Sequence, residues 1–175
     1  MFEQRHHDAL LEMRRRLFGY ACALSPDIAS AEDLYQDAVL RAMSARKVPE
    51  DPAAFRVWLF RLLRNLWIDR LRASGRLPDL TQEEMLDAAS EQTPEDTVVN
   101  RLAVRQAFMT LSKPHRDVLA LVDIAGFSYA EAAEILDTPS GTIMSRVSRA
   151  RSTLAKRLSE DDKVVALPQS RQARG

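Results

Sequence analysis

The chain has 175 residues, 46% of them hydrophobic, and its 25 basic and 25 acidic residues leave no net charge. Its one cysteine, Cys22, excludes an internal disulfide bond and fits a reducing compartment. No apolar run approaches the roughly 18 residues that span a bilayer, and charges occupy the N-terminal stretch where a signal peptide is apolar. We therefore expect a cytoplasmic protein without membrane insertion.

Few glycines and no alternating runs of valine or threonine predict an all-α chain. The first three helices are expected near 6–24, 30–44 and 52–73. The breaks between them are Ser25-Pro26-Asp27 and a segment with two prolines, 48–52. Ser30 is the expected N-cap of the second helix, and Pro52 stands where a first helical turn tolerates proline.

The apolar period is interrupted after Gly75 and resumes at Val98. The acidic segment 76–97 is therefore predicted to be a flexible linker, with at most a helical turn near 83–88. Four more helices are expected, near 98–111, 113–125, 129–136 and 140–158. Two small helical domains, 1–75 and 98–160, are thus predicted, followed by a disordered tail, 161–175.

The charges are distributed unevenly along this neutral chain. Residues 52–76 carry six bases and one acid, a net charge of +5, and residues 141–158 carry five bases and no acid. Between them, residues 77–97 carry seven acids and no base. Two basic segments that flank an acidic one are typical of two polyanion-binding modules joined by a linker. The alternative is ordinary solvated charge on helix surfaces.

The last two predicted helices have a helix-turn-helix signature: a short helix, a tight turn and a longer basic helix. Ser128 and Glu131 have the spacing of a capping box, and Ser140 is the expected N-cap of the longer helix. That helix has an apolar side, formed by Ile143, Val147, Ala150, Leu154 and Leu158. Its polar side includes Thr142, Ser145 and Arg149, with Arg146 at the flank.

This polar side has the chemistry of a DNA-reading surface. Short hydroxyl side chains permit close approach to base edges, and arginines bind guanine bidentately or pair with phosphates. The N-terminus of the helix adds free N–H groups that favour phosphate. The alternative is an amphipathic helix with a basic outer face.

The second and third helices also have two distinct sides. The second packs Leu34, Tyr35, Ala38 and Ala42 inward, and its other face carries Asp33, Gln36, Asp37 and Leu40. A leucine on an acidic face favours a protein-docking surface, although single exposed leucines are common. The third helix has an apolar stripe, formed by Phe55, Trp58, Leu59, Leu62 and Leu66. Its other side is basic and carries Arg61, Arg64, Asn65, Ile68 and Arg72.

Over about residues 8–158 the chain resembles the extracytoplasmic-function (ECF, group 4) sigma factors of bacterial RNA polymerase. The resemblance rests on SAEDLYQDAVLRAM, FRVWLFRLLRNLWIDRLR and LSKPHRDVLALVDIAGFSYAEAAEILDTPSGTIMSRVSRARSTL. It implies a region 2 domain, a flexible linker and a region 4 helix-turn-helix domain. It also implies a non-enzymatic factor that binds core RNA polymerase, recognises −10 and −35 promoter elements, and is held inactive by an anti-sigma factor.

The resemblance also implies roles for particular residues. Core polymerase would contact the DLYQD helix, through Asp33, Gln36, Asp37 and Leu40. The −10 strand and its flipped base would meet the loop Arg46–Asp51 and the face of Arg61, Arg64 and Asn65. The −35 element would be contacted by Thr142, Ser145, Arg146 and Arg149. The chain departs from the family at Tyr35, where smaller aliphatics are common, and has no extra aromatic on its basic region 2 face.

Three other functions were weighed against this one. A sigma-like decoy that binds an anti-sigma factor need not keep a basic recognition face, whereas this chain has one. A helix-turn-helix repressor would leave the DLYQD and FRVWL segments unexplained. For an enzyme, His6 and His7 are a poor metal pair, and neither His115 nor Cys22 has a visible partner. The sequence predicts no cofactor, metal or small-molecule substrate. We also hypothesise that the two domains pack together or around an anti-sigma factor, with the acidic linker shielding the basic surfaces.

Overall fold

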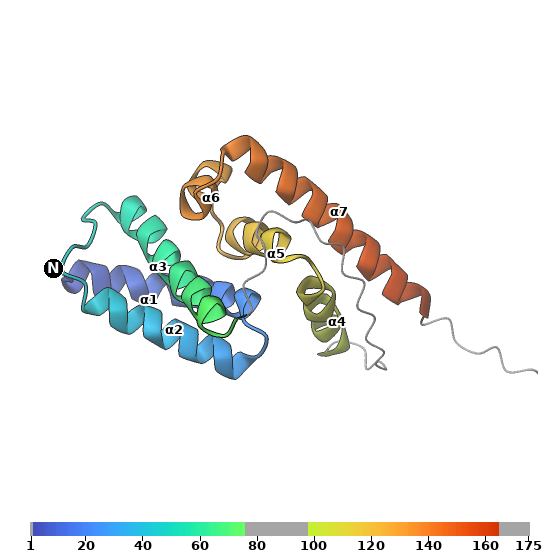
Figure 1. The fold of residues 1–175 in the computed structure, drawn as a ribbon, viewed down its shortest axis with the longest axis horizontal. Helices are drawn as coiled ribbons and strands as arrows, with labels where there is room; N and C mark the ends of the chain where they lie inside the picture. Colours follow the sequence, from blue (N-terminus) through green and yellow to red (C-terminus); the bar gives the residue numbers. More distant parts are fainter. Residues whose placement is uncertain (1, 76–97, 165–175) are drawn as a thin grey trace, which may run out of the picture.

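The computed structural model describes residues 2–75 and 98–164, with side chains for residues 2–75 and 103–159. All regular secondary structure in those ranges is helical, which confirms the predicted all-α class (Figure 1). The N-terminal domain contains α1 (Gln4–Leu24), α2 (Ile28–Met43) and α3 (Pro52–Ala73). The C-terminal domain contains α4 (Val98–Met109), α5 (Lys113–Leu119), the π-helix η1 (Ala120–Ile124), α6 (Tyr129–Leu136) and α7 (Ser140–Val164). The predicted linker with its helical turn, and most of the predicted tail, lie outside the described residues.

Aspartates cap the second and third helices. The Asp27 side chain accepts from the Ser30 amide at 2.7 Å, so α2 begins at Ile28 and the predicted N-cap at Ser30 is wrong. Asp27 also accepts from the Ser30 hydroxyl, which is therefore a partner of the cap. Asp51 caps α3 by accepting from the Ala54 amide at 2.8 Å, with Pro52 in the first turn. Both caps satisfy amides that a helix start leaves without a partner.

The core of the N-terminal domain forms where α1, α2 and α3 meet. The predicted inner side of α2 is confirmed, with Leu34, Ala38 and Ala42 buried and Tyr35 partly buried. The three buried alanines of α2, Ala31, Ala38 and Ala42, let the helices approach closely. The Tyr35 ring packs edge-on against Phe18, with ring centroids 5.8 Å apart, and this contact accommodates the larger side chain at that position.

Helix α3 is buried on more than the predicted stripe. Phe55, Leu59 and Leu66 of that stripe are buried, whereas Trp58 and Leu62 are half-buried. Phe60, Leu63 and Trp67 lie outside the stripe and are also buried. The reason is that α3 lies between α1 and α2 on one side and α6 of the C-terminal domain on the other (Figure 1).

The helix-turn-helix forms as predicted, with one correction. Ser128 and Glu131 form the capping box of α6. Helix α6 ends at Asp137 in a left-handed conformation, with φ 51°. Ser140 is the first residue of α7 and not its N-cap, since the Pro139 carbonyl accepts from the amides of Thr142 and Ile143. The apolar side of α7 faces the core: Ile143, Val147 and Ala150 are buried, and Leu154 and Leu158 are partly buried.

The predicted helix 113–125 changes type partway. Its backbone widens to the i→i+5 pattern at η1, where the Ala125 amide donates to the Ala120 carbonyl at 2.9 Å. This widened turn packs against α1. Gly19 permits the close approach, because a β-carbon there would lie 3.0 Å from the Ile124 side chain. The two domains thus contact each other through α1 and η1 as well as through α3 and α6.

Candidate nucleic-acid and polymerase interfaces

The four predicted −35 contacts lie along the first half of α7. Arg149 is exposed and donates to the Ser145 hydroxyl at 3.4 Å, and Ser145 donates to the Thr142 carbonyl at 3.0 Å. Arg146 is half-buried and lines a small cavity together with Arg64 and Asp117, so it faces the neighbouring domain. The side chains of Arg149 and Ser145 and the backbone carbonyl of Thr142 thus form one hydrogen-bonded polar row, and Arg146 stands at its edge.

A bidentate ion pair joins α7 to the π-helix. Two guanidinium nitrogens of Arg151, Nε and Nη2, donate to Asp123 at 3.2 and 2.5 Å. These hydrogen bonds and the charge of Asp123 raise the pKa of Arg151. The pair lies wholly within the C-terminal domain, where it joins α7 to η1.

The predicted −10 residues of α3 have different surroundings. Asn65 is exposed. Arg64 donates from Nε to Asp117 Oδ2 of α5 at 2.8 Å, and Arg61 donates to the backbone carbonyl of Glu134 in α6. The structure therefore leaves one of the three open and gives the two arginines partners in the other domain.

Asp117 is a buried carboxylate with a partner on each oxygen. Besides Arg64, it accepts a 2.5 Å hydrogen bond from the Tyr20 hydroxyl of α1. Burial and the nearby Asp117 charge raise the pKa of Tyr20 well above its ordinary value. Burial opposes the charge of Arg64, but the Asp117 carboxylate outweighs it and raises the pKa of that guanidinium. Tyr20 therefore stays neutral and Arg64 stays charged at neutral pH.

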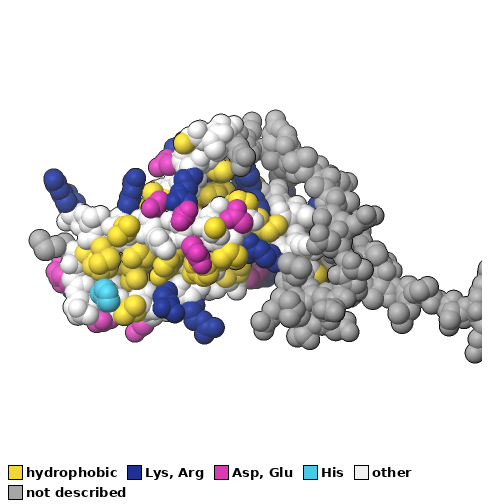
Figure 2. Space-filling view, turned by 90° about the horizontal axis from the view of Figure 1, so that it is seen from below, with side chains coloured by type: hydrophobic (Ala, Val, Ile, Leu, Met, Phe, Trp, Pro, Cys, Tyr) yellow, Lys and Arg dark blue, Asp and Glu magenta, His cyan; other side chains and the backbone are white. Residues whose placement is uncertain are grey.

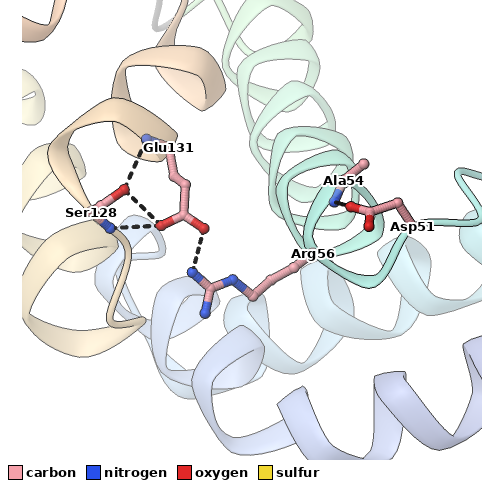
Figure 3. A network of polar contacts seen from close by, with 5 residues as sticks. All are labelled: Asp51, Ala54, Arg56, Ser128 and Glu131. Atoms are coloured by element: carbon pink, nitrogen blue, oxygen red, sulfur yellow. Dashed lines mark hydrogen bonds and ion pairs between the residues drawn. The ribbon is translucent and has the colours of Figure 1, made fainter.

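A third arginine of α3 also reaches the C-terminal domain. Arg56 donates from Nη2 to Glu131 Oε1 at 2.7 Å, and Glu131 also holds the Ser128 cap of α6 (Figure 3). The Arg56 guanidinium lies over the Phe127 ring, 4.3 Å from its centroid. Burial opposes ionisation of Glu131, yet the hydrogen bonds from Ser128 and Arg56 lower its pKa. We call these contacts the arginine interface: Arg56, Arg61 and Arg64 with Glu131, the Glu134 carbonyl and Asp117.

Four members of this region were not predicted from the sequence: Tyr20, Arg56, Asp117 and Glu131 as an interdomain partner. Two signals pointed toward them. Asp117 is an acid on a helix whose neighbours Val118, Ala120 and Leu121 are all apolar and buried. Phe60 and Trp67 are large apolar residues outside the stripe of α3, and Phe60 packs edge-on against Phe127 with centroids 4.7 Å apart.

The loop Arg46–Asp51 is anchored at its end nearest α3. His6 is buried, and its Nε2 donates to the Pro49 carbonyl at 3.1 Å while its Nδ1 accepts from the Glu3 amide at 2.9 Å. This pair of bonds assigns the neutral Nε2–H tautomer. His6 also packs against Phe55, with ring centroids 5.1 Å apart. Arg46 and Lys47 remain exposed on the other half of the loop.

The predicted polymerase contacts on α2 are all exposed. We call this set the docking face: Asp33, Gln36, Asp37 and Leu40. Leu40 is 65% exposed, and the exposed Met43 lies nearly one turn further along. Asp37 pairs with Arg70 of α3 at 2.5 Å. Seen from below, hydrophobic side chains form a band on this side of the molecule, with acidic side chains beside them (Figure 2).

Metal sites, reactive thiols and membrane-spanning helices are the other features that bear on function. Residues 2–75 and 103–159 contain no group of three His, Cys, Asp or Glu side chains placed to hold a metal ion. Cys22 lies in an apolar groove between α1 and α4, where burial raises the pKa of its thiol. Among the described helices, none has the length and apolarity to cross a bilayer.

The comparisons with known proteins agree with this architecture. A model of Sigma-70 region 2 matches residues 10–77, and a model of Sigma-70, region 4 matches residues 101–154. The chain is 33% identical to the ECF RNA polymerase sigma factor SigM of Mycobacterium tuberculosis over 155 residues, which cover 89% of this chain and 74% of that one. It is 32% identical to the sigma factor EcfG of Rhodopseudomonas palustris over 154 residues, or 88% and 85% of the two chains.

Two solved structures share the fold. The sigma factor RpoE of Bartonella quintana, in complex with the anti-sigma factor NepR, matches with a TM-score of 0.68 and 30% identity over 91% of this chain and 99% of that one. CnrH, in complex with the cytosolic domain of CnrY, matches with a TM-score of 0.65 and 25% identity over 91% of both chains.

A helical chain with both a region 2 domain and a region 4 helix-turn-helix domain is a sigma-70-type protein, a class of non-enzymatic transcription initiation factors. Within that class, the chain belongs to the ECF sigma factors of RNA polymerase. The family resemblance inferred from the three sequence segments is thereby confirmed. The N-terminal domain is region 2, and the C-terminal domain is region 4.

Proposed function

We propose that the chain directs promoter-specific initiation by core RNA polymerase. The docking face of α2 would bind the polymerase, and Arg61, Arg64 and Asn65 with the loop Arg46–Asp51 would bind the −10 element. Thr142, Ser145, Arg146 and Arg149 would bind the −35 element in the major groove. The observation that carries the proposal is the presence, on one chain of this family, of an exposed acidic docking face and a basic recognition helix.

The geometry of α7 supports the −35 assignment. Ser145 and Thr142 are short side chains near the start of the helix, where the backbone N–H groups favour phosphate. Arg149 follows one turn later and is exposed to a ligand. Helix-turn-helix proteins insert the N-terminal residues of their second helix into the major groove.

The test is in vitro transcription with core polymerase on genomic DNA fragments, with and without the chain. We expect new transcripts that start at defined positions only when the chain is present. If none appear while the chain still binds an anti-sigma factor, the chain is a decoy. If it binds duplex DNA specifically without polymerase, it is a repressor.

We also propose that an anti-sigma factor binds this chain. The support is that the solved structures of two relatives, RpoE and CnrH, are complexes with NepR and with the cytosolic domain of CnrY. A cognate anti-sigma factor should form a stoichiometric complex with the chain and suppress the transcripts of the assay above. A complex that leaves transcription unchanged contradicts this role.

A further inference from the structure

The loop between α2 and α3 is attached to the first turn of α1 by a buried histidine. His6 Nε2 donates to the carbonyl of Pro49, 43 residues further along the chain, at 3.1 Å. Its Nδ1 accepts from the Glu3 amide at 2.9 Å, so both ring nitrogens have partners. The ring also packs against Phe2 and Phe55, with centroids 5.5 and 5.1 Å away. His6 is only 3% exposed, so its side chain is out of reach of a DNA strand.

We propose that His6 is a positioning residue for the loop Arg46–Asp51, and that it thereby sets how strictly the chain selects a base of the −10 element. The histidine acts through the Pro49 carbonyl and does not touch DNA. This inference rests on the proposed function, because that function assigns the loop to the −10 strand.

Two contacts fix the part of the loop nearest α3. Asp51 caps α3 through the Ala54 amide at 2.8 Å, and His6 holds Pro49 two residues earlier. Arg46 and Lys47, at the other end of the loop, are exposed. A loop with one half fixed on a rigid scaffold can present the side chains of its other half in a defined place, as binding loops generally do.

The hydrogen bond from His6 is a stronger attachment than the ion pair beside it. Arg5 and Glu50 also join α1 to the loop, at 3.7 Å, but their side chains are 49% and 81% exposed. Ion pairs as exposed as this one contribute little to stability. A buried donor such as His6 Nε2, in contrast, loses free energy when its acceptor moves away. The carbonyl is also the only backbone hydrogen-bonding group of Pro49, because proline has no N–H.

The position of the loop matters because a flipped base needs a site that is already formed. Taking a base out of the stack costs free energy, which contacts in the site must offset. If the loop also samples other positions, the affinity for the captured base falls by the fraction of time that the site is formed. One hydrogen bond changes the ratio of two such positions by about fivefold. Bases that bind without the site lose nothing, so the loss falls on the preferred base.

The test uses two substitutions that each keep one of the two hydrogen bonds of His6. In His6→Asn the amide oxygen lies as many bonds from the backbone as Nδ1 does, so it still accepts from Glu3 but leaves Pro49 without its donor. In His6→Gln the amide nitrogen lies as many bonds from the backbone as Nε2 does, so it still donates to Pro49. His7→Asn is the matched control, because His7 is the next residue and is exposed.

Each protein is combined with core polymerase and a promoter found by the genomic transcription assay. Initiation is compared on templates that carry every base in turn at each −10 position, and on templates altered in the −35 element. We expect His6→Asn to reduce the preference for the best −10 base about fivefold and to leave the −35 preference unchanged. His6→Gln and His7→Asn should keep the wild-type preference at both elements.

Two results overturn the inference. One is a wild-type −10 preference in His6→Asn. The other is an equal loss of preference in His6→Asn and His6→Gln, since an equal loss means that His6 only stabilises the fold. If His6→Asn fails to fold, His6→Phe replaces it in the same comparison with His6→Gln. His6→Phe keeps an aromatic ring against Phe2 and Phe55 and removes both hydrogen bonds.

The wild-type protein separates this inference from the proposed function. If it initiates with a −10 preference that His6→Asn shares in full, only the role of His6 is wrong. If it fails to initiate, or initiates without any −10 preference, the proposed function is itself wrong and the role of His6 falls with it.

Discussion

Arg64 and Asp117 belong to different domains and meet at 2.8 Å in a largely buried ion pair. The arginine comes from the helix predicted to bind the −10 strand, and the aspartate comes from the helix that precedes the helix-turn-helix. The packing of region 4 on region 2 therefore holds Arg64 in an ion pair that solvent barely reaches.

Replacing Tyr20 by phenylalanine should weaken the fold in a pH-dependent way. At neutral pH the variant leaves one oxygen of buried Asp117 without its donor, at a cost of about 1.5–3 kcal/mol for a hydrogen bond to a charged group. The folded state raises the pKa of Tyr20, so its contribution is complete below the ordinary pKa of about 10 and is lost as the pH rises above it. Urea unfolding should show a difference between wild type and variant that shrinks above about pH 10. A difference that grows with pH contradicts this assignment.

Acidification should open the Arg56–Glu131 pair. The folded state lowers the pKa of Glu131, so its contribution to stability is complete above the ordinary glutamate pKa of about 4.5 and is lost as the pH falls through the lowered value. Protonation removes both the partner of Arg56 and the acceptor of the Ser128 cap. Energy transfer between fluorescent labels at Glu12 and Ser159, exposed positions of the two domains, should therefore fall on acidification in the wild type. In Glu131→Gln it should be low already at neutral pH. The prediction is contradicted if energy transfer in the wild type does not change with pH and has the same value in Glu131→Gln.

Replacing Leu40 by alanine should reduce polymerase binding without harming the fold. The side chain is 65% exposed, so truncation leaves no cavity. If Leu40 is buried at the centre of the polymerase interface, its truncation should cost more than about 1 kcal/mol of binding free energy. Titration of labelled core polymerase measures it. The matched control is Leu11→Ala, since Leu11 is 53% exposed on α1; equal affinities of the two variants argue against the docking face.

Replacing Arg149 by alanine should weaken −35 recognition and spare polymerase binding. Arg149 is exposed on the polar row of α7, and loss of one specific arginine contact costs about 1–3 kcal/mol. Footprinting of the holoenzyme on a promoter measures the effect. Arg157→Ala, on the same helix but outside the predicted contacts, controls for the lost charge. Lost polymerase affinity with unchanged promoter affinity would refute the assignment.

Local sequence patterns were sufficient to predict the buried sides of α2 and α7 and the cap of α6. The periodicity of α2 and α7 placed Leu34, Ala38, Ile143 and Val147 in the core, and the spacing of Ser128 and Glu131 gave the capping box. The errors concern the N-caps of α2 and α7, where more than one residue near the helix start can act as the cap. Ser30 and Ser140 are acceptable caps in isolation, but Asp27 and the Pro139 carbonyl allow each helix to begin earlier. The binding residues of α2, α3 and α7 stay predictions until the experiments above are made.

The family, the all-helical class and the chemical character of each helix face could be predicted from the sequence, because they depend on residues close together along the chain. Which basic residues are accessible depends instead on how the two domains pack. Arg61, Arg64 and Asn65 look alike on a helical wheel, yet only Asn65 is exposed while the arginines have partners in region 4. Those partners lie 53 residues away for Arg64 and 73 for Arg61. A periodic pattern carries no information about such pairs, since they depend on how two finished domains pack.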